Sequence, residues 1–526
     1  MPLDLTTNSG PIDQDNPKIA DVLKDLQGNI LNGHGRDHAA HIFIAFDKPN
    51  QIENVKKWIA RLDVTSAKAQ LDGTERYKRE KADAGLFTHF ALSTSGYARL
   101  GIPVNKIPTG ANPQKRTAPF YANSFQEGMK NRASVLLDPP TSNWESGFQN
   151  SIDAVLLLAN DDPAELIAQE IKILEQLKDI ATVRTIERGF TLRRKFDTVD
   201  TTNPSNEFGV VVEHFGYADG VSQPIFLKKQ YEREKSLKGT RFWEPAAPLK
   251  LVLIPDPNGK TADVSFGSFL VFRKLEQNVQ GFKTAEAKLG ESLGLPRELA
   301  GAMAVGRYED GSPIVLQPGD GAWANTNKPA IPNDFNYQGD KLGLTCPFHA
   351  HIRKSNPRLE SVKADGPFAK SKEEELGHRI ARRGITYGGP LSSSDNLDDL
   401  PTNGVGLLFM CYQSDIWEQF EFIQRFWCNN PNFLEPGISG GTNPNYDKTG
   451  LDAVIGQKLG EQADPVINEA PKPPKNWPSQ WGKSTVKPEI TDENQFGQFV
   501  TLKGGEYFFS PSISFLKNLS GSSPSK

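Results

Sequence analysis

An aspartate framed by glycines stands in the segment FGYADGVSQP, residues 215–224. Gly216 and Gly220 allow the backbone to turn tightly and to approach another group closely, so Asp219 can be held in place without bulky neighbours covering it. A carboxylate held in this way can accept and return a proton. Asp and Gly are also the commonest turn residues, so the string taken alone predicts only a turn.

A second segment combines imidazoles with positive charge. In CPFHAHIRKSNPR, residues 346–358, the side chains of His349 and His351 precede Arg353 and Arg358. Haem iron takes a neutral imidazole on one face, and its two propionates pair with Arg or Lys. A zinc site would need a third or fourth ligand that we do not find in the sequence. Without a cofactor, the same pattern would be a solvated strand or turn.

A third segment, HRIARRGITYGG at residues 378–389, places Arg379, Arg382 and Arg383 ahead of an aromatic stretch bounded by glycine. A guanidinium stays charged at every relevant pH and can donate several hydrogen bonds to negative charge that develops on an oxygen atom, such as that of a bound peroxide. The alternative is a basic helix end with no role in chemistry.

The elements that must position these residues follow a repeated pattern. In the first half, strands are predicted at residues 41–46, 86–92, 154–159 and 182–187, and helices at 51–62 and 163–177. This order is that of a split βαβ, ferredoxin-like unit. In the second half, strands are predicted at 210–213, 249–254, 268–273 and 405–412, and helices at 296–305 and 414–427. We therefore predict two units of one type, an N-terminal domain at 1–205 and a C-terminal domain at 206–526.

Composition narrows the class of protein. The 526 residues are 37% apolar and 24% charged, which is typical of a globular chain large enough to bury a cofactor. The net charge is -4 and no apolar run approaches the roughly 20 residues of a spanning helix, so we expect neither a nucleic acid nor a membrane as partner. Residues 1–18 lack a basic start followed by an apolar stretch, which predicts no secretory signal in this numbering. A cytoplasmic protein and an exported one both fit these facts.

Together, the three segments resemble the motifs of the dye-decolorising peroxidase family. The GxxDG motif stands at residues 216–220, the proximal CPFxAHIRKxNPR at 346–358 and the distal RRGIxYG at 382–388. Similar segments cover most of the chain: LQGNILNGHGRDHA, GSFLVFRKLEQNV, GRYEDGSP, GLDAVIGQ and GGEYFFSPSISFLK. The whole pattern is most similar to the long fungal-type branch of the family.

The resemblance implies an α+β fold of two ferredoxin-like domains, antiparallel sheets with peripheral helices, in which the C-terminal domain holds most of one haem b. His351 would be the axial ligand of the iron, because the family's axial histidine directly precedes the IRK tripeptide. His349, where alanine commonly stands, is the alternative.

The other implied roles lie around that haem. Asp219 would be the distal acid and base, and Arg382 the distal arginine. The remaining residues are Leu407 and Phe409 in the distal pocket, Arg353 as a propionate partner, and Asp452, with Asp415 as the alternative, beside the proximal imidazole.

The implied activity is the reduction of hydrogen peroxide coupled to the oxidation of dyes, phenols and lignin-like aromatic compounds, with manganese as a further candidate reductant. Bulky dyes cannot reach a buried haem, so Tyr387 and Trp427 are implied as surface radical sites, although either ring could simply pack in a core. A haem-binding or haem-handling protein with little turnover is the alternative function. Asp219 and Arg382 favour the enzyme, because storage needs only an axial ligand and an apolar cavity.

Overall fold

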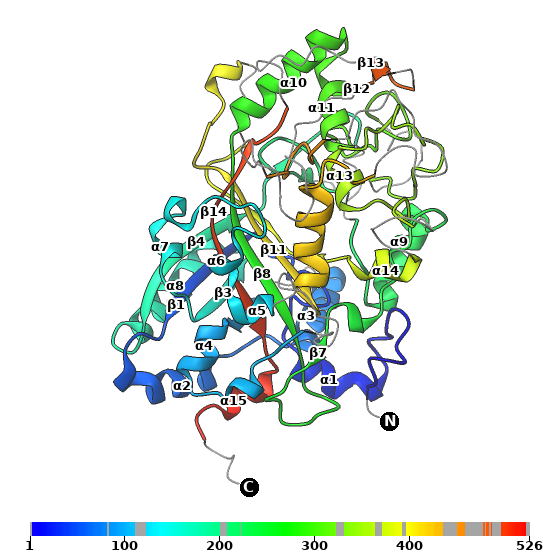
Figure 1. Ribbon diagram of the computed structural model, residues 1–526. Coiled ribbons are helices and arrows are strands. Elements are labelled where there is room, and N and C mark those ends of the chain that lie inside the picture. Colours follow the sequence, from blue (N-terminus) through cyan, green and yellow to red (C-terminus); the bar gives the residue numbers. More distant parts are fainter. Residues whose placement is uncertain are drawn as a thin grey trace.

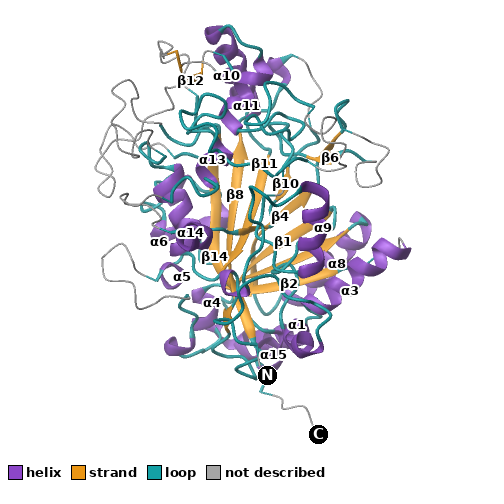
Figure 2. Ribbon diagram, turned by 90° about the vertical axis from the view of Figure 1, so that its right-hand side faces the viewer, coloured by secondary structure: helices purple, strands orange, loops and turns teal. Residues whose placement is uncertain are grey.

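The computed structural model describes residues 3–521, apart from residues 81–83, 111–122, 200–207, 221, 322–330, 363–370, 392–395, 435–449, 458–476, 479, 483–484 and 487–495. A ten-stranded antiparallel sheet runs through the molecule and helices lie around it (Figures 1 and 2). Helices α1 (Ala20–Asp25) and α15 (Ile513–Asn518) lie at the end of the molecule where the chain begins and finishes (Figure 1). Within the described residues, no helix is both long and apolar enough to cross a membrane.

The first half of the chain builds the predicted split βαβ unit. Its strands are β1 (His38–Ala45), β2 (Phe87–Leu92), β3 (Ala154–Asn160) and β4 (Thr182–Phe190), in the spatial order β2-β3-β1-β4. Helix α2 (Ile52–Arg61) follows β1, and α8 (Pro163–Leu177) connects β3 to β4. The carboxylate of Asp162 caps α8 by accepting hydrogen bonds from two backbone N–H groups. Pro163 fits the first helical position because a backbone N–H at that position would have no partner within the helix.

The second half repeats this topology. Strand β8 (Phe266–Gln277) is followed by helices α10 (Val279–Leu293) and α11 (Arg297–Val305), and then by β10 (Ile385–Tyr387), β11 (Gly406–Gln413) and β14 (Val500–Ser510). The spatial order β10-β11-β8-β14 matches that of the first half, with β8 in the place of β1. The two ferredoxin-like units with antiparallel sheets and outer helices are therefore confirmed.

The two sheets join edge to edge. Strand β14 pairs with β2 through Phe509 and Leu92, and the Thr386 hydroxyl of β10 donates a hydrogen bond to the Phe190 carbonyl of β4. One hydrophobic core consequently spans both halves, which are linked by contacts such as that of Phe43 with the ring of Phe272 at 4.7 Å. The predicted domain boundary between residues 205 and 206 falls in a stretch outside the described residues and stays a prediction.

Residues 249–254, predicted as a strand, fold differently. They form a turn of 3-10 helix at Leu249–Leu251 and then reach the two-residue strand β7 (Ile254–Pro255). The backbone N–H of Leu253 bonds to the carbonyl of Leu249, which turns the chain back on itself. An unbroken apolar run does not distinguish a buried turn from a buried strand, because the side chains are covered in both. The prediction of a strand here was wrong.

Residues 414–427, predicted as a helix, are helical but more widely wound. Two π-helical segments cover Trp417–Glu421 and Ile423–Cys428. Asp415 begins the segment by accepting the backbone N–H groups of Trp417 and Glu418. The spacing of the apolar residues predicted which face of the helix is buried, but not that the helix has π-helical hydrogen bonding. Such π segments are frequent at functional sites, and this one borders the cavity described below.

A buried carboxylate fastens this helical segment to the first half of the chain. Glu421 is fully buried and accepts two hydrogen bonds from the guanidinium of Arg132, at 2.6 and 3.1 Å. The hydroxyls of Ser124 and Tyr507 donate to the same carboxylate, each at 2.9 Å. All four donors converge on one charge, so removing that charge would leave the buried guanidinium with the partly exposed Glu127, at 3.1 Å, as its remaining ionic partner.

We therefore expect Glu421→Ala to lower the free energy of unfolding by about 3–5 kcal/mol, the usual result of removing one partner from a buried ion pair. Chemical denaturation followed by circular dichroism measures this change. The matched control is Glu175→Ala, because the Glu175 side chain is 75% exposed and its ion pair with Lys178 lies at the surface. Loss of this ion pair should lower the free energy of unfolding by less than about 1 kcal/mol. Equal stability of the two variants would contradict the role of Glu421.

Candidate active site

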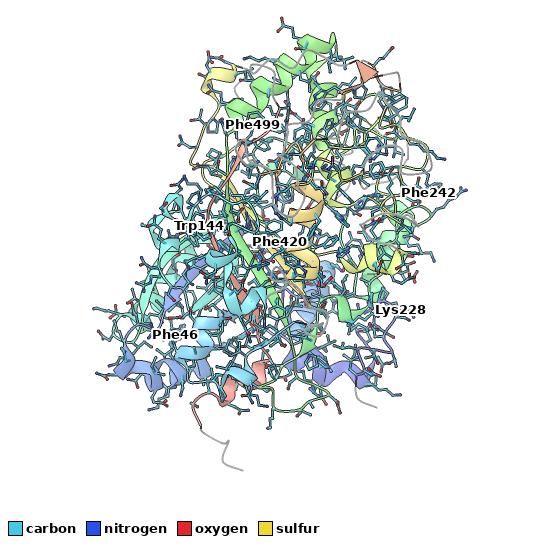
Figure 3. The ribbon with its side chains drawn as sticks, viewed as in Figure 1. Phe46, Trp144, Lys228, Phe242, Phe420 and Phe499 are labelled. Carbon is cyan, nitrogen blue, oxygen red and sulfur yellow. The ribbon has the colours of Figure 1, made fainter. Side chains whose placement is uncertain are left out.

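One cavity of about 410 Å³ is lined by side chains of β8, β10 and β11, by the 216–220 loop, by α13 (His351–Ser355) and by the π-helical segment. Figure 3 labels two lining residues, Phe420 near the middle of the view and Phe242 toward its right-hand edge. Phe420 is 5% exposed and Phe242 47% exposed, so the cavity runs from the interior to the surface. The predicted site residues that border it are Asp219, His351, Arg382, Leu407 and Phe409.

The sheet supplies an apolar wall. Leu407 and Phe409 are alternate residues of β11, so their side chains point to the same face. Leu275 of β8 stands opposite Leu407, and Arg273 opposite Phe409. The charge of Arg273 is held by Asp138, whose carboxylate accepts two hydrogen bonds at 2.5 and 2.8 Å. This wall can therefore contact a large flat apolar ligand without leaving a nearby charge unpaired.

The glycines on either side of Asp219 have the functions that the sequence suggested. Gly216 has a φ of +92°, a turn conformation that side chains disfavour. At Gly220, an added Cβ would lie 2.3 Å from the Cζ atom of Arg307, so a larger residue would displace the guanidinium from this position. The carboxylate of Glu213 accepts the backbone N–H groups of Phe215 and Tyr217 and so fixes the start of the loop. The backbone conformation thus favours glycine at 216, and the neighbouring Arg307 side chain favours it at 220.

Asp219 and Arg382 form a pair inside the cavity. The Nη2 atom of Arg382 lies 3.2 Å from Oδ1 of Asp219, and the two side chains are 35% and 47% exposed. Short strand β9 (Ala381–Arg382) holds the arginine, because Arg382 pairs with Cys411 of β11. The pair offers a proton acceptor and a permanent hydrogen-bond donor side by side, which is what the cleavage of a small oxygen species needs.

His351 makes a second pair at the first residue of α13. Its Nδ1 atom donates to Oδ2 of Asp452 at 2.9 Å, while Oδ1 of Asp452 accepts the backbone N–H groups of Val454 and Ile455. Burial disfavours the charge of Asp452, but the His351 ring and these amides outweigh it and lower the pKa of the carboxyl. Because Nδ1 carries the donated proton, Nε2 is left with a lone pair for a metal ion.

The two alternatives left open by the sequence lie elsewhere. His349 is buried, its ring meets that of Trp477 edge to face at 4.3 Å, and it does not line the cavity. Asp415 caps the π-helical segment, and it is Asp452 that accepts the hydrogen bond from His351. The geometry therefore favours His351 and Asp452 for the proximal roles.

Arg353 does not stand where the predicted propionate partner should be. Its side chain is fully buried, outside the cavity lining, and is paired with Asp340 at 2.8 Å and Glu360 at 2.6 Å. Residues two apart in a helix point in nearly opposite directions, so a His351 side chain that borders the cavity turns Arg353 away from it. The geometry therefore does not favour Arg353 as a propionate partner, and the assignment stays a prediction.

Two other arginines take its place at the cavity. Arg307 and Arg358 line it and both donate to the Oδ1 atom of Asn333, at 2.8 and 2.6 Å. Neither forms an ion pair with an acidic residue in the described parts of the chain, and their other acceptors there are the hydroxyl of Ser222 and backbone carbonyls. Burial lowers the pKa of Arg307 to about 10 and that of Arg358 to about 9. Two buried cations that share neutral partners fit an anionic ligand.

Sequence reasoning grouped Arg358 with the basic residues after His351 but gave no role to Arg307. The signal was present, since Arg307 belongs to the GRYEDGSP segment that resembles the family. What the sequence did not show is that this segment returns to the GxxDG loop, where Arg307 packs against Gly220.

The two predicted surface aromatics are not at the surface. Tyr387 is 7% exposed and Trp427 is 2% exposed, and neither lines the cavity. The Tyr387 hydroxyl and the Trp427 indole N–H are buried without a hydrogen-bond partner among the described residues. Tyr387 lies on the short strand β10 and Trp427 on the apolar face of a helical segment, so packing explains both positions.

The site as a whole fits haem. It offers an imidazole with a free Nε2, an apolar wall, and two cations suited to carboxylate groups. The Asp219 and Arg382 pair remains available for a small oxygen substrate.

Comparison with known proteins agrees with this chemistry. The family model of the DyP dimeric alpha+beta barrel domain matches residues 25–191. A multifunctional dye peroxidase of the bacterium Amycolatopsis, DyP2, is 39% identical to this chain, covering 99% of it and all of the relative. The crystal structure of an Anabaena DyP-type peroxidase has a TM-score of 0.79 at 40% identity and covers 97% of each chain.

A dye-decolorizing peroxidase of Auricularia auricula-judae is 30% identical, covering 93% of this chain and 85% of that protein. The bacterial Amycolatopsis protein is more similar in sequence to this chain than the Auricularia protein is, so the predicted fungal-type branch is not confirmed. The similarity nevertheless extends over almost the entire chain, in sequence and in fold. The chain therefore belongs to the dye-decolorising peroxidase family, as its three motifs predicted, and is a peroxidase.

Proposed function

We propose that this enzyme binds one haem b, reduces hydrogen peroxide and oxidises dyes, phenols and lignin-like aromatic compounds. The observation that carries the proposal is that one cavity is bordered by His351, which is held by Asp452 behind it, and by the Asp219 and Arg382 pair. A haem-handling protein would need only the first of these. The names of the relatives, which include dye peroxidases from several organisms, support the same substrate class.

Four residues would hold the cofactor. Nε2 of His351 would bind the iron, and Asp452 would keep the ring in the required tautomer and orientation. The guanidinium groups of Arg307 and Arg358 would pair with the two propionates. When bound, haem supplies the redox chemistry, since its iron accepts the oxidising equivalents of peroxide and passes them to a reductant.

Asp219 and Arg382 would act on the peroxide itself. The carboxylate of Asp219 would take the proton from one peroxide oxygen and return it to the other, so that the second oxygen leaves as water. The guanidinium of Arg382 would donate hydrogen bonds to the peroxide as negative charge develops on it, and its contact with Oδ1 would keep Asp219 in position. The apolar side chains of Leu407 and Phe409 would limit the water beside the reacting atoms.

We expect Asp219→Asn to slow the reaction with hydrogen peroxide by about 10²- to 10⁴-fold, the usual contribution of a positioned acid or base. The amide keeps an oxygen for Arg382 but cannot take a proton, so haem content should stay that of the wild type. Stopped-flow absorption after mixing with peroxide measures the rate. Asp219→Glu retains a carboxylate and is the matched control. A wild-type rate in a fully haem-loaded Asp219→Asn enzyme would contradict the role of Asp219.

The choice of Arg307 and Arg358 over Arg353 can be tested by haem release. Loss of one charge-assisted pair of about 1.5–3 kcal/mol should speed haem transfer to a high-affinity acceptor protein by about 10- to 100-fold in Arg307→Met and in Arg358→Met. Arg353→Met removes an arginine from a buried cluster with Asp340 and Glu360, so we expect it mainly to destabilise the apoprotein. Release of haem from both cavity variants at the wild-type rate would show that these residues do not hold the propionates.

Finer aspects of the reaction remain predictions. Buried Tyr387 and Trp427 would serve bulky dyes as internal relays rather than as contact points on the surface. Manganese gains no support from the described residues, in which no three His, Cys, Asp or Glu side chains gather to hold a metal ion.

A further inference from the structure

A tyrosine in the cavity wall forms a short hydrogen bond with a buried glutamate. Tyr217, two residues before Asp219, borders the cavity and is 6% exposed. Its hydroxyl lies 2.5 Å from Oε1 of Glu286 on helix α10, and Glu286 is 1% exposed. None of the roles assigned above uses this pair.

The surroundings of the pair keep water away from it. At Gly301 of helix α11, an added Cβ would lie 2.2 Å from the Tyr217 hydroxyl and 2.5 Å from Oε1 of Glu286, so the backbone of α11 covers the hydrogen bond directly. Phe282 closes another side, with its ring edge to face at 6.1 Å from that of Tyr217. A proton that leaves the phenol therefore has the Glu286 carboxylate as its acceptor.

A chain of charges leads from this carboxylate toward the surface. Lys283 Nζ lies 3.0 Å from Glu286 and 2.7 Å from Glu309, and Glu309 pairs at 2.6 Å with Arg194, whose side chain is 41% exposed. The same Lys283 Nζ lies 4.8 Å from the centre of the Tyr217 ring. Tyr217 thus stands between the cavity and a network that ends in solvent.

Oxidation of a phenol by one electron makes its O–H strongly acidic, so a buried tyrosine gives up an electron readily only if a base accepts the proton. Tyr217 has such a base at hydrogen-bond distance. Tyr387 does not, since its buried hydroxyl lacks a partner among the described residues. Of these two buried tyrosines, only Tyr217 combines contact with the cavity and a hydrogen-bonded carboxylate.

We propose that Tyr217 is a redox-active residue of this peroxidase and that Glu286 accepts its proton. After peroxide has oxidised the cofactor, one electron passes from Tyr217 to the cofactor, and the phenolic proton moves to Oε1 of Glu286. A neutral tyrosyl radical then remains at Tyr217. An aromatic reductant then supplies one electron to the radical while Glu286 returns the proton, which restores both side chains. The inference rests on the proposed haem peroxidase function.

The resting state suits this role. Burial, followed by the charges of Glu286 and Glu309, raises the pKa of Tyr217 well above its ordinary value, so the phenol keeps its proton until oxidation. Burial also raises the pKa of Glu286, against the opposing charge of Lys283, which increases the affinity of this carboxylate for a proton.

The test uses the full haem-loaded chain, mixed with one equivalent of hydrogen peroxide without reductant, frozen within milliseconds and examined by electron paramagnetic resonance. We expect a tyrosyl signal in the wild type that narrows when the protein carries ring-deuterated tyrosine. Tyr217→Phe should abolish the signal, whereas Tyr387→Phe should retain it. Glu286→Gln leaves Tyr217 and a hydrogen-bond acceptor in place but removes the base, and it should also abolish the signal. The haem absorption of each variant shows that it is folded and loaded.

The other outcomes are distinguishable. A full tyrosyl signal in Tyr217→Phe, or its loss in Tyr387→Phe alone, would overturn the assignment to Tyr217. A full signal in Glu286→Gln would overturn the role of Glu286 as proton acceptor. A wild-type haem spectrum that changes with peroxide while no tyrosyl signal forms would overturn the inference and leave the proposed function intact. A spectrum that does not respond to peroxide would remove both.

Discussion

The hydrogen bond between His351 and Asp452 is the interaction on which the site depends. It joins residues 101 positions apart, and it requires a charged carboxylate to remain fully buried. The backbone makes this feasible, because the amides of Val454 and Ile455 donate to the other carboxylate oxygen. Bonds from the loop backbone to the carbonyls of Cys428 and His349 then tie Asp452 to the π-helical segment and to the start of α13. The ring of His351 is thereby held in one tautomer at the cavity.

A surplus of positive charge is the second constraint. Five arginines among the described residues line the cavity. Arg273 is matched by Asp138 and Arg382 by Asp219. Arg379 donates to backbone carbonyls, while Arg307 and Arg358 share the neutral side chain of Asn333. Holding two guanidinium groups in this way costs free energy in the protein alone. A ligand with two carboxylates would offset that cost, so its binding should also stabilise the fold. Fold stability and cofactor affinity are therefore coupled through the same residues.

Much of this architecture was visible in the sequence. Strands such as β3, with seven consecutive buried residues, and the capped helix α8 follow directly from local pattern, and three motifs located Asp219, His351 and Arg382. Strand β14, which was not predicted, contains a bulge between Leu502 and Gly504 that interrupts its alternation. Long-range packing explains why a different arginine lines the cavity. Proximity to His351 in the sequence suggested Arg353, but the first turn of α13 directs these two side chains apart and brings in Arg307 from a distant loop.

The central claim is that His351 supplies the metal ligand of the cavity, and haem absorption of His351→Ala tests it most directly. Reconstituted with haem, this variant should lose the wild-type ferric spectrum and regain it when imidazole is added to occupy the space left by the side chain. His349→Ala, which alters a buried ring two residues away, should keep the wild-type spectrum without imidazole. A wild-type spectrum in His351→Ala, or its loss in His349→Ala with rescue by imidazole, would contradict the account.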